Sequence, residues 1–137
     1  PAIIDGTIGV NRLMHNTQWV PGHFHFYLLL GVLPMILTLL YHVVGSRARA
    51  PADSRADRLS LALYVVGGIS FCMVFLYAGH MSVARRFAAH LPEWVPYDRA
   101  GSIAAMVLIL GMLLFATRLI VGLLKAPADV DPAHRTG

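Results

Sequence analysis

Three long stretches of this sequence carry no charged side chain. They span 34, 26 and 18 residues, and lie between Arg12 and Arg47, between Arg58 and Arg85, and between Arg99 and Arg118. A helix of about 20 apolar residues is long enough to cross the hydrocarbon layer of a bilayer, which is about 30 Å thick. Hydrophobic residues make up 57% of the chain. We therefore predict an all-α integral membrane bundle with three transmembrane helices.

Charged and turn-forming residues set the expected boundaries. We expect transmembrane helices at residues 19–45, 59–80 and 101–124, a cytoplasmic loop at 46–58 and an outer loop at 81–100. Residues 1–18 are predicted to form an outer loop segment, and residues 125–137 a cytoplasmic tail. Pro34 falls in the middle of the first helix and predicts a kink there, which a membrane helix tolerates when its neighbours bond the freed carbonyl. Gly67 and Gly68 predict close packing of the second helix.

The positive charges indicate how the helices are oriented. Four arginines lie in or next to the first loop, and basic residues follow the last helix, which by the positive-inside rule places both in the cytoplasm. The N-terminus and the 81–100 loop then lie outside. The net charge of +4 is thus explained by membrane topology, and no nucleic-acid partner is predicted. Arg118 is expected to extend its head group to the cytoplasmic interface, and the single cysteine, Cys72, to pack as a small apolar residue.

The segment WVPGHFHF at residues 19–26 places two histidines at the head of the first apolar stretch. Neighbours two positions apart on a helix point about 200° apart, so His23 and His25 cannot reach one metal ion from the same face. They can each serve a large ligand on opposite sides of the helix, and neutral imidazole is a standard axial ligand of haem iron. The alternative is two polar side chains bonded to neighbouring helices or to interfacial water. We favour two haems, because an ionisable residue at this depth is a functional candidate by default.

Arg85 and Arg86 stand on the side of the membrane where basic residues are depleted. A negatively charged partner would explain them, and haem propionates are carboxylates that guanidinium groups bind through paired hydrogen bonds. Lipid phosphates are the alternative partner. His15 precedes the first helix at the same end and is a further candidate for propionate binding. No paired acids, Ser-His-Asp pattern, Cys-x-x-Cys motif or phosphate loop points to another chemistry.

The stretch HNTQWVPGHFHFYLLLGV resembles the tenth-helix signature of the catalytic subunit of haem-copper oxidases, and is most similar to the B-type branch. The stretch AGHMSVARRFAAHLPEWVP resembles the segment before the last helix of the same subunit, in which an arginine pair contacts propionates. The resemblance covers most of the chain, but only as the C-terminal three helices of a twelve-helix core.

This resemblance implies a role for each candidate residue. His23 would be the proximal ligand of a high-spin haem that faces copper, and His25 an axial ligand of a low-spin haem. Phe24 would lie between the two macrocycles. Arg85 and Arg86 would hold propionates, with His15 nearby. The activity implied is reduction of dioxygen to water, coupled to proton translocation in a bacterial or archaeal plasma membrane.

The copper-binding histidines of the family belong to earlier helices and are not in this sequence. The chain is therefore expected to act as a fragment or a split subunit, in complex with the remaining helices of the catalytic subunit, which carry the copper. Oxidase subunit II and cytochrome c or a similar donor are the other partners implied. Two alternatives stay open: a nitric-oxide reductase of the same superfamily, and a non-catalytic structural membrane subunit derived from the oxidase.

Overall fold

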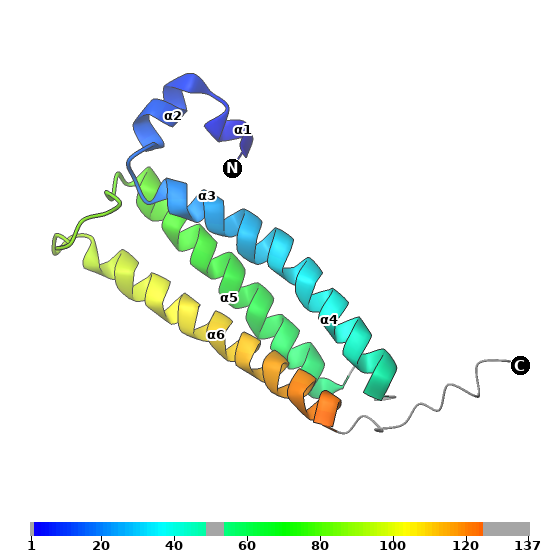
Figure 1. The fold of residues 1–137 in the computed structure, drawn as a ribbon. Helices are drawn as coiled ribbons and strands as arrows, with labels where there is room; N and C mark the ends of the chain where they lie inside the picture. The colour runs from blue at the N-terminus through cyan, green and yellow to red at the C-terminus, as the bar shows by residue number, and fades with distance from the viewer. Residues whose placement is uncertain (1, 49–53, 125–137) are drawn as a thin grey trace, which may run out of the picture.

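The computed structural model describes residues 2–48 and 54–124, and Figure 1 shows their arrangement. Two short helices, α1 (Ala2–Asp5) and α2 (Ile8–Met14), precede three long helical rods. The first rod joins α3 (Trp19–Tyr27), the π-helical segment η1 (Leu28–Val32) and α4 (Leu33–Ala48). The second and third rods are α5 (Arg55–His80) and α6 (Val95–Leu124).

The three rods confirm the predicted all-α membrane bundle. Within the described residues, three helices of 28, 26 and 30 residues are long and apolar enough to cross a membrane, with mean hydropathies of 2.1, 2.2 and 2.5. The rod formed by α5 lies between the other two in Figure 1 and packs against both. Cys72 on α5 is completely buried, which fits the apolar packing role expected from the sequence.

The helix boundaries differ from the expected ones in four places. The first rod ends at Ala48 rather than at residue 45. Residues 1–18, expected as a loop, contain α1 and α2. The second rod begins at Arg55 rather than at residue 59, because Ser54 and Asp57 form a capping box: the Asp57 amide donates to Ser54 Oγ at 3.2 Å, and the Ser54 amide donates to Asp57 Oδ2 at 3.0 Å. The third rod begins at Val95 rather than at residue 101, with Pro96 in its first turn, where proline is tolerated. The predicted tail, 125–137, lies outside the described residues.

Just before Pro34, where the sequence predicts a kink, the first rod contains the π-helical segment η1. Here the amide of Leu33 donates to the carbonyl of Leu28, five residues back. The same register sets Pro34 opposite the carbonyl of Leu29, but proline has no N–H to donate. The hydroxyl of Tyr64 on α5 donates to that carbonyl instead. A neighbouring helix therefore supplies the hydrogen bond that the proline removes, as the sequence predicted.

Glycine allows α5 and α6 to touch at the backbone. A Cβ atom on Gly67 would overlap the backbone of Leu108, and one on Gly111 would lie 2.6 Å from the amide nitrogen of Tyr64. Gly68 faces the other way, where a Cβ atom would lie 3.1 Å from a methyl group of Leu30. The Gly67–Gly68 pair thus packs against both neighbouring rods, which confirms the close packing predicted from the pair.

We predict that Gly67→Ala destabilises the bundle by about 1–3 kcal/mol, because the added methyl group forces the backbones of α5 and α6 apart. Gly45→Ala is the matched control, since a Cβ atom on Gly45 would meet nothing within 4 Å. Unfolding in mixed detergent–SDS micelles, followed by circular dichroism, measures both. Equal stability of the two variants would contradict the backbone contact.

Candidate functional site

The two histidines lie where the start of α3 meets the end of α5. A Cβ atom on Gly22 of α3 would lie 2.9 Å from the amide nitrogen of Leu76, and one on Gly79 of α5 would overlap the backbone of Trp19. Both glycines are buried. The two helices therefore approach at backbone distance at this end of the bundle, which we call the histidine end (residues 15–25 and 79–95).

His25 points toward α5. Its ring centroid lies 5.3 Å from that of Phe71 and 6.0 Å from that of Phe75. Its Nδ1 atom is 2.6 Å from the carbonyl oxygen of Pro21. A hydrogen bond to a carbonyl requires that Nδ1 carry the proton, so Nε2 keeps its lone pair. The ring is thus fixed by a neutral acceptor on its own helix and can act as a ligand through Nε2.

His23 has different neighbours. Its Nδ1 atom makes an ion-pair contact with Oδ2 of Asp5 on α1, and its ring centroid lies 4.6 Å from that of Tyr27. Its Nε2 atom is buried and has no hydrogen-bond partner among the described residues. Phe24, between the two histidines, is exposed. The two imidazoles therefore have separate surroundings, and in each of them Nδ1 is the ring nitrogen that contacts a neighbouring oxygen.

Main-chain hydrogen bonds bring the arginine pair beside the segment that precedes α3. The amide of Arg85 donates to the carbonyl of Asn16 at 3.1 Å, and Thr17 and Ala84 form an antiparallel bridge. Residues 15–18 and 83–86, far apart in the sequence, are thus neighbours at the histidine end. Of the five candidate residues chosen from the sequence, His15, Arg85 and Arg86 lie in these two segments, and His23 and His25 follow in the first two turns of α3.

The three outer candidates differ in their environment. The Nε atom of Arg85 is buried and has no hydrogen-bond partner within residues 2–48 and 54–124. Arg86 is exposed and has a φ of 67°, a left-handed backbone conformation that costs a non-glycine residue free energy and is often found at functional sites. His15 is exposed. No contact joins either arginine side chain to the two histidines in the described residues.

Sequence reasoning missed Asp5. Its Oδ1 atom accepts a hydrogen bond from the indole Nε1 of Trp19 at 2.6 Å, while Oδ2 faces His23. Only the fold of α1 and α2 back over the start of α3 creates this arrangement (Figure 1). A single acid eighteen positions before its partner carries no local signal that could have identified it.

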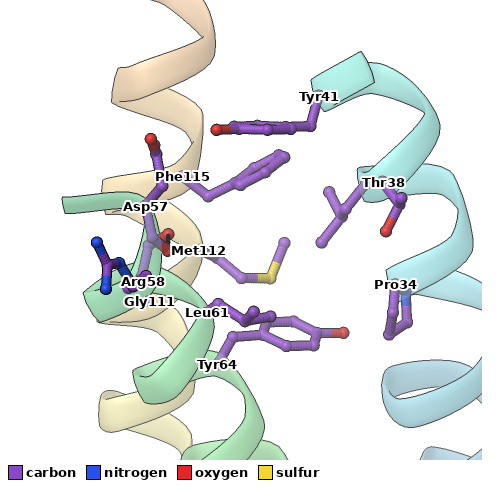
Figure 2. Close-up of a pocket in the computed structure, with 12 residues that line it drawn as sticks. Pro34, Thr38, Tyr41, Asp57, Arg58, Leu61, Tyr64, Gly111, Met112 and Phe115 are labelled. Carbon is purple, nitrogen blue, oxygen red and sulfur yellow. Dashed lines mark hydrogen bonds between the residues drawn. The ribbon is translucent and has the colours of Figure 1, made fainter. Parts of the chain in front are cut away.

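A second polar cluster was also missed, at the opposite end of the bundle. Arg118 on α6, expected to reach the interface, binds Asp57 with both ends of its guanidinium: Nε lies 3.0 Å from Oδ1, and a terminal nitrogen 3.3 Å from Oδ2. Asp57 also lines a cavity of about 320 Å³ between α4, α5 and α6 (Figure 2). The cavity is lined by Pro34, Leu37, Thr38, Tyr41, Asp57, Arg58, Ser60, Leu61, Tyr64, Gly111, Met112 and Phe115.

We predict that Asp57 and Arg118 stabilise the bundle jointly. A double-mutant cycle of Asp57→Asn and Arg118→Gln is expected to give a coupling free energy on the order of 0.5–1 kcal/mol, the upper range for a partly exposed pair with paired hydrogen bonds. The same cycle with Arg55→Gln, an exposed arginine of the same helical turn, is the control and should give no coupling. SDS unfolding of the four variants checks this, and equal coupling in both cycles would contradict a specific pair.

Comparison with known proteins places the chain in one family. Residues 2–107 match the family described as "Cytochrome C and Quinol oxidase polypeptide I". The chain is 29% identical over 121 residues to "Cytochrome c oxidase subunit 1" of Thermus thermophilus, covering 82% of this chain and 22% of that protein. It is 27% identical over 129 residues to "Heme-copper oxidase subunit I+III" of Aeropyrum pernix, covering 89% and 15%.

A third relative is "Quinol oxidase subunit 1" of Sulfolobus acidocaldarius, 26% identical over 123 residues, which covers 87% of this chain and 23% of that protein. The chain thus spans less than a quarter of the length of these three relatives. No solved structure matches it. The family match extends from α1 into α6 and includes every candidate residue of the histidine end, and the chain therefore belongs to the cytochrome c and quinol oxidase polypeptide I family, the subunit I family of haem-copper oxidases.

Proposed function

We propose that this chain is the C-terminal part of the catalytic subunit of a terminal respiratory oxidase, in which His23 and His25 bind two different haems. One observation carries the proposal: each imidazole has Nδ1 engaged and Nε2 left for a ligand, in two separate environments two residues apart. Metal-binding histidines almost always place their second ring nitrogen against a carboxylate or a backbone carbonyl. His23 and His25 show one case of each.

The residues fit a haem by their unsatisfied atoms. The buried Nε2 of His23 has no partner in the described part of the chain, and an unpaired polar atom inside a membrane protein costs several kcal/mol. Iron would satisfy that atom. The buried Nε of Arg85 likewise has no hydrogen-bond partner in the described residues, and a propionate carboxylate would satisfy it. Arg86 and His15 lie at the same end and complete the proposed propionate-binding set.

We assign His23 to the high-spin haem and His25 to the low-spin haem, following the resemblance to the B-type branch. Bound haem iron supplies the electron-transfer and oxygen chemistry. The chain's own residues hold and orient the ligands: Pro21 fixes the His25 ring, the Phe71–Phe75 pair packs against it, and Asp5 engages His23. Phe24 separates the two ligands in the sequence and would lie between the macrocycles.

The rest of the enzyme must come from other segments. We propose that the remaining helices of the catalytic core carry the copper site, and that subunit II and cytochrome c or a similar donor complete the complex. The relatives' names include a cytochrome c oxidase and a quinol oxidase, so either class of donor is compatible. The proposed activity is reduction of dioxygen to water with proton translocation, in a bacterial or archaeal plasma membrane with the N-terminus outside and the C-terminus cytoplasmic. A nitric-oxide reductase and a structural subunit remain the alternatives.

We predict that the two histidines act on different haems. In the whole complex, His23→Ala should abolish carbon monoxide binding and oxygen reduction while a low-spin signal persists. His25→Ala should convert or remove the low-spin haem, and the high-spin haem should still bind carbon monoxide. Optical and EPR spectroscopy of the two variants measures both effects.

The outcomes separate the competing functions. Identical spectral changes in both variants would mean that the histidines share one site, and would contradict the two-haem assignment. Unchanged haem spectra in both would instead support the structural subunit. Comparing turnover with dioxygen and with nitric oxide in the unmodified complex distinguishes the oxidase from the reductase.

We predict that the arginines raise the haem midpoint potentials. Removing a positive charge near the iron favours its oxidised, more cationic form, so Arg→Gln changes should shift the potentials to lower values in redox titrations. Arg85→Gln should have the larger effect, because the Arg85 side chain is half-buried and Arg86 is exposed. Arg99→Gln on α6, outside the junction of 15–18 with 83–86, is the control. Unchanged potentials in the double variant would support lipid phosphates as the partner.

A further inference from the structure

Asp5 accepts a hydrogen bond through one carboxylate oxygen and forms an ion pair through the other. Oδ1 accepts the hydrogen bond from Trp19 at 2.6 Å, and Oδ2 contacts Nδ1 of His23. Both side chains are 21% exposed, so the contact is largely removed from solvent. The backbone of Trp19 is in turn fixed against Gly79. This geometry differs from a surface ion pair, in which long side chains are free to separate.

We propose that Asp5 is a positioning residue that holds His23 as an axial ligand and increases its electron donation to the iron. The inference rests on the proposed function. A carboxylate bonded to Nδ1 fixes the proton on that nitrogen, orients the ring and makes Nε2 a stronger base. Asp5 is the only acid in contact with His23 or His25 among the described residues.

The two histidines then differ in the charge of the group that contacts Nδ1. His25 donates from Nδ1 to the neutral carbonyl of Pro21, whereas His23 faces the anionic carboxylate of Asp5. A negative charge behind the imidazole stabilises ferric over ferrous iron, because the ferric ion carries one more positive charge. Asp5 therefore lowers the potential of the haem bound by His23 and leaves that of the haem bound by His25 nearly unchanged.

The test compares Asp5→Asn with Asp5→Glu in the whole oxidase complex. Asn keeps the size and a hydrogen-bond acceptor but removes the charge, whereas Glu keeps the charge. We expect Asp5→Asn to shift the midpoint potential of the high-spin haem upward and to lower its iron–histidine stretching frequency in resonance Raman spectra. Retention of that haem should fall by about 10–100-fold, the usual effect of losing such a supporting group. Asp5→Glu should restore both signals toward those of the unmodified protein.

Asp98→Asn is the matched control. His90 and Asp98 form a second histidine–carboxylate pair, with Nδ1 2.6 Å from Oδ2. Their side chains are 25% and 43% exposed, and His90 lies in the connection before α6 while Asp98 lies in its first turn. This variant should leave both haem potentials unchanged. If Asp5→Asn fails to assemble, Trp19→Phe tests the role of Asp5 instead. This variant removes the hydrogen bond from Trp19 to Asp5 while leaving His23 in place. It should shift the midpoint potential of the high-spin haem and the iron–histidine frequency in the same directions as Asp5→Asn.

Each outcome bears on one claim. Unchanged signals in Asp5→Asn, or in Trp19→Phe when only that variant assembles, would overturn the role of Asp5. Equal shifts in the midpoint potentials of both haems would also overturn it, because they would show a general change in the electrostatic field rather than an effect through His23. The His23→Ala variant separates this inference from the proposed function. If His23→Ala loses the high-spin haem but Asp5→Asn has no effect, only the inference is rejected. If His23→Ala keeps its high-spin haem, the proposed function is rejected.

Discussion

The contact between α3 and α5 fixes the geometry on which the candidate site depends. Gly22 and Gly79 leave no side chain between the two backbones, so the helices meet at van der Waals distance. In a membrane, lipid tails are as apolar as the helices themselves, and close packing of small residues is a principal source of helix association. This approach sets His25 against the aromatic rings of α5. It also fixes the backbone of Trp19, whose indole binds Asp5, the residue that contacts His23.

The π-helical segment η1 explains how one rod serves two partners. A π turn contains one residue more than an α turn, and each residue of a helix turns by about 100°, so the faces of α4 are rotated relative to those of α3. Before η1, α3 packs against α5. After it, α4 packs against α6, where the rings of Tyr41 and Phe115 lie 6.2 Å apart. Pro34 makes the α register unfavourable, and Tyr64 compensates by bonding the carbonyl of Leu29.

The sequence predicted the features that have a period, a composition or a motif. The charge-free gaps predicted the three rods, because burial in lipid requires long apolar runs, and Gly67–Gly68 predicted close packing. It did not predict α1 and α2, the π register or the pairing of Asp57 with Arg118. Those depend on contacts between residues distant in the chain, and Asp57 and Arg118 are 61 positions apart. The roles of His23, His25 and the arginines stay predictions, although the fold gathers them at one end.

Buried polar atoms without hydrogen-bond partners, rather than exposed apolar side chains, indicate that this chain binds a further group. Large apolar side chains are exposed along all three rods, and none of the most apolar window of the α3–α4 rod is buried. Lipid covers such surfaces without cost, so they do not specify what else must bind. Lipid tails offer no hydrogen bond, so lipid cannot satisfy the buried Nε2 of His23 or the buried Nε of Arg85. Under the proposed function a haem would satisfy both, with iron at the first and a carboxylate at the second. The proposal that this chain works within a larger oxidase therefore rests on the polar atoms of the histidine end and not on the apolar surface.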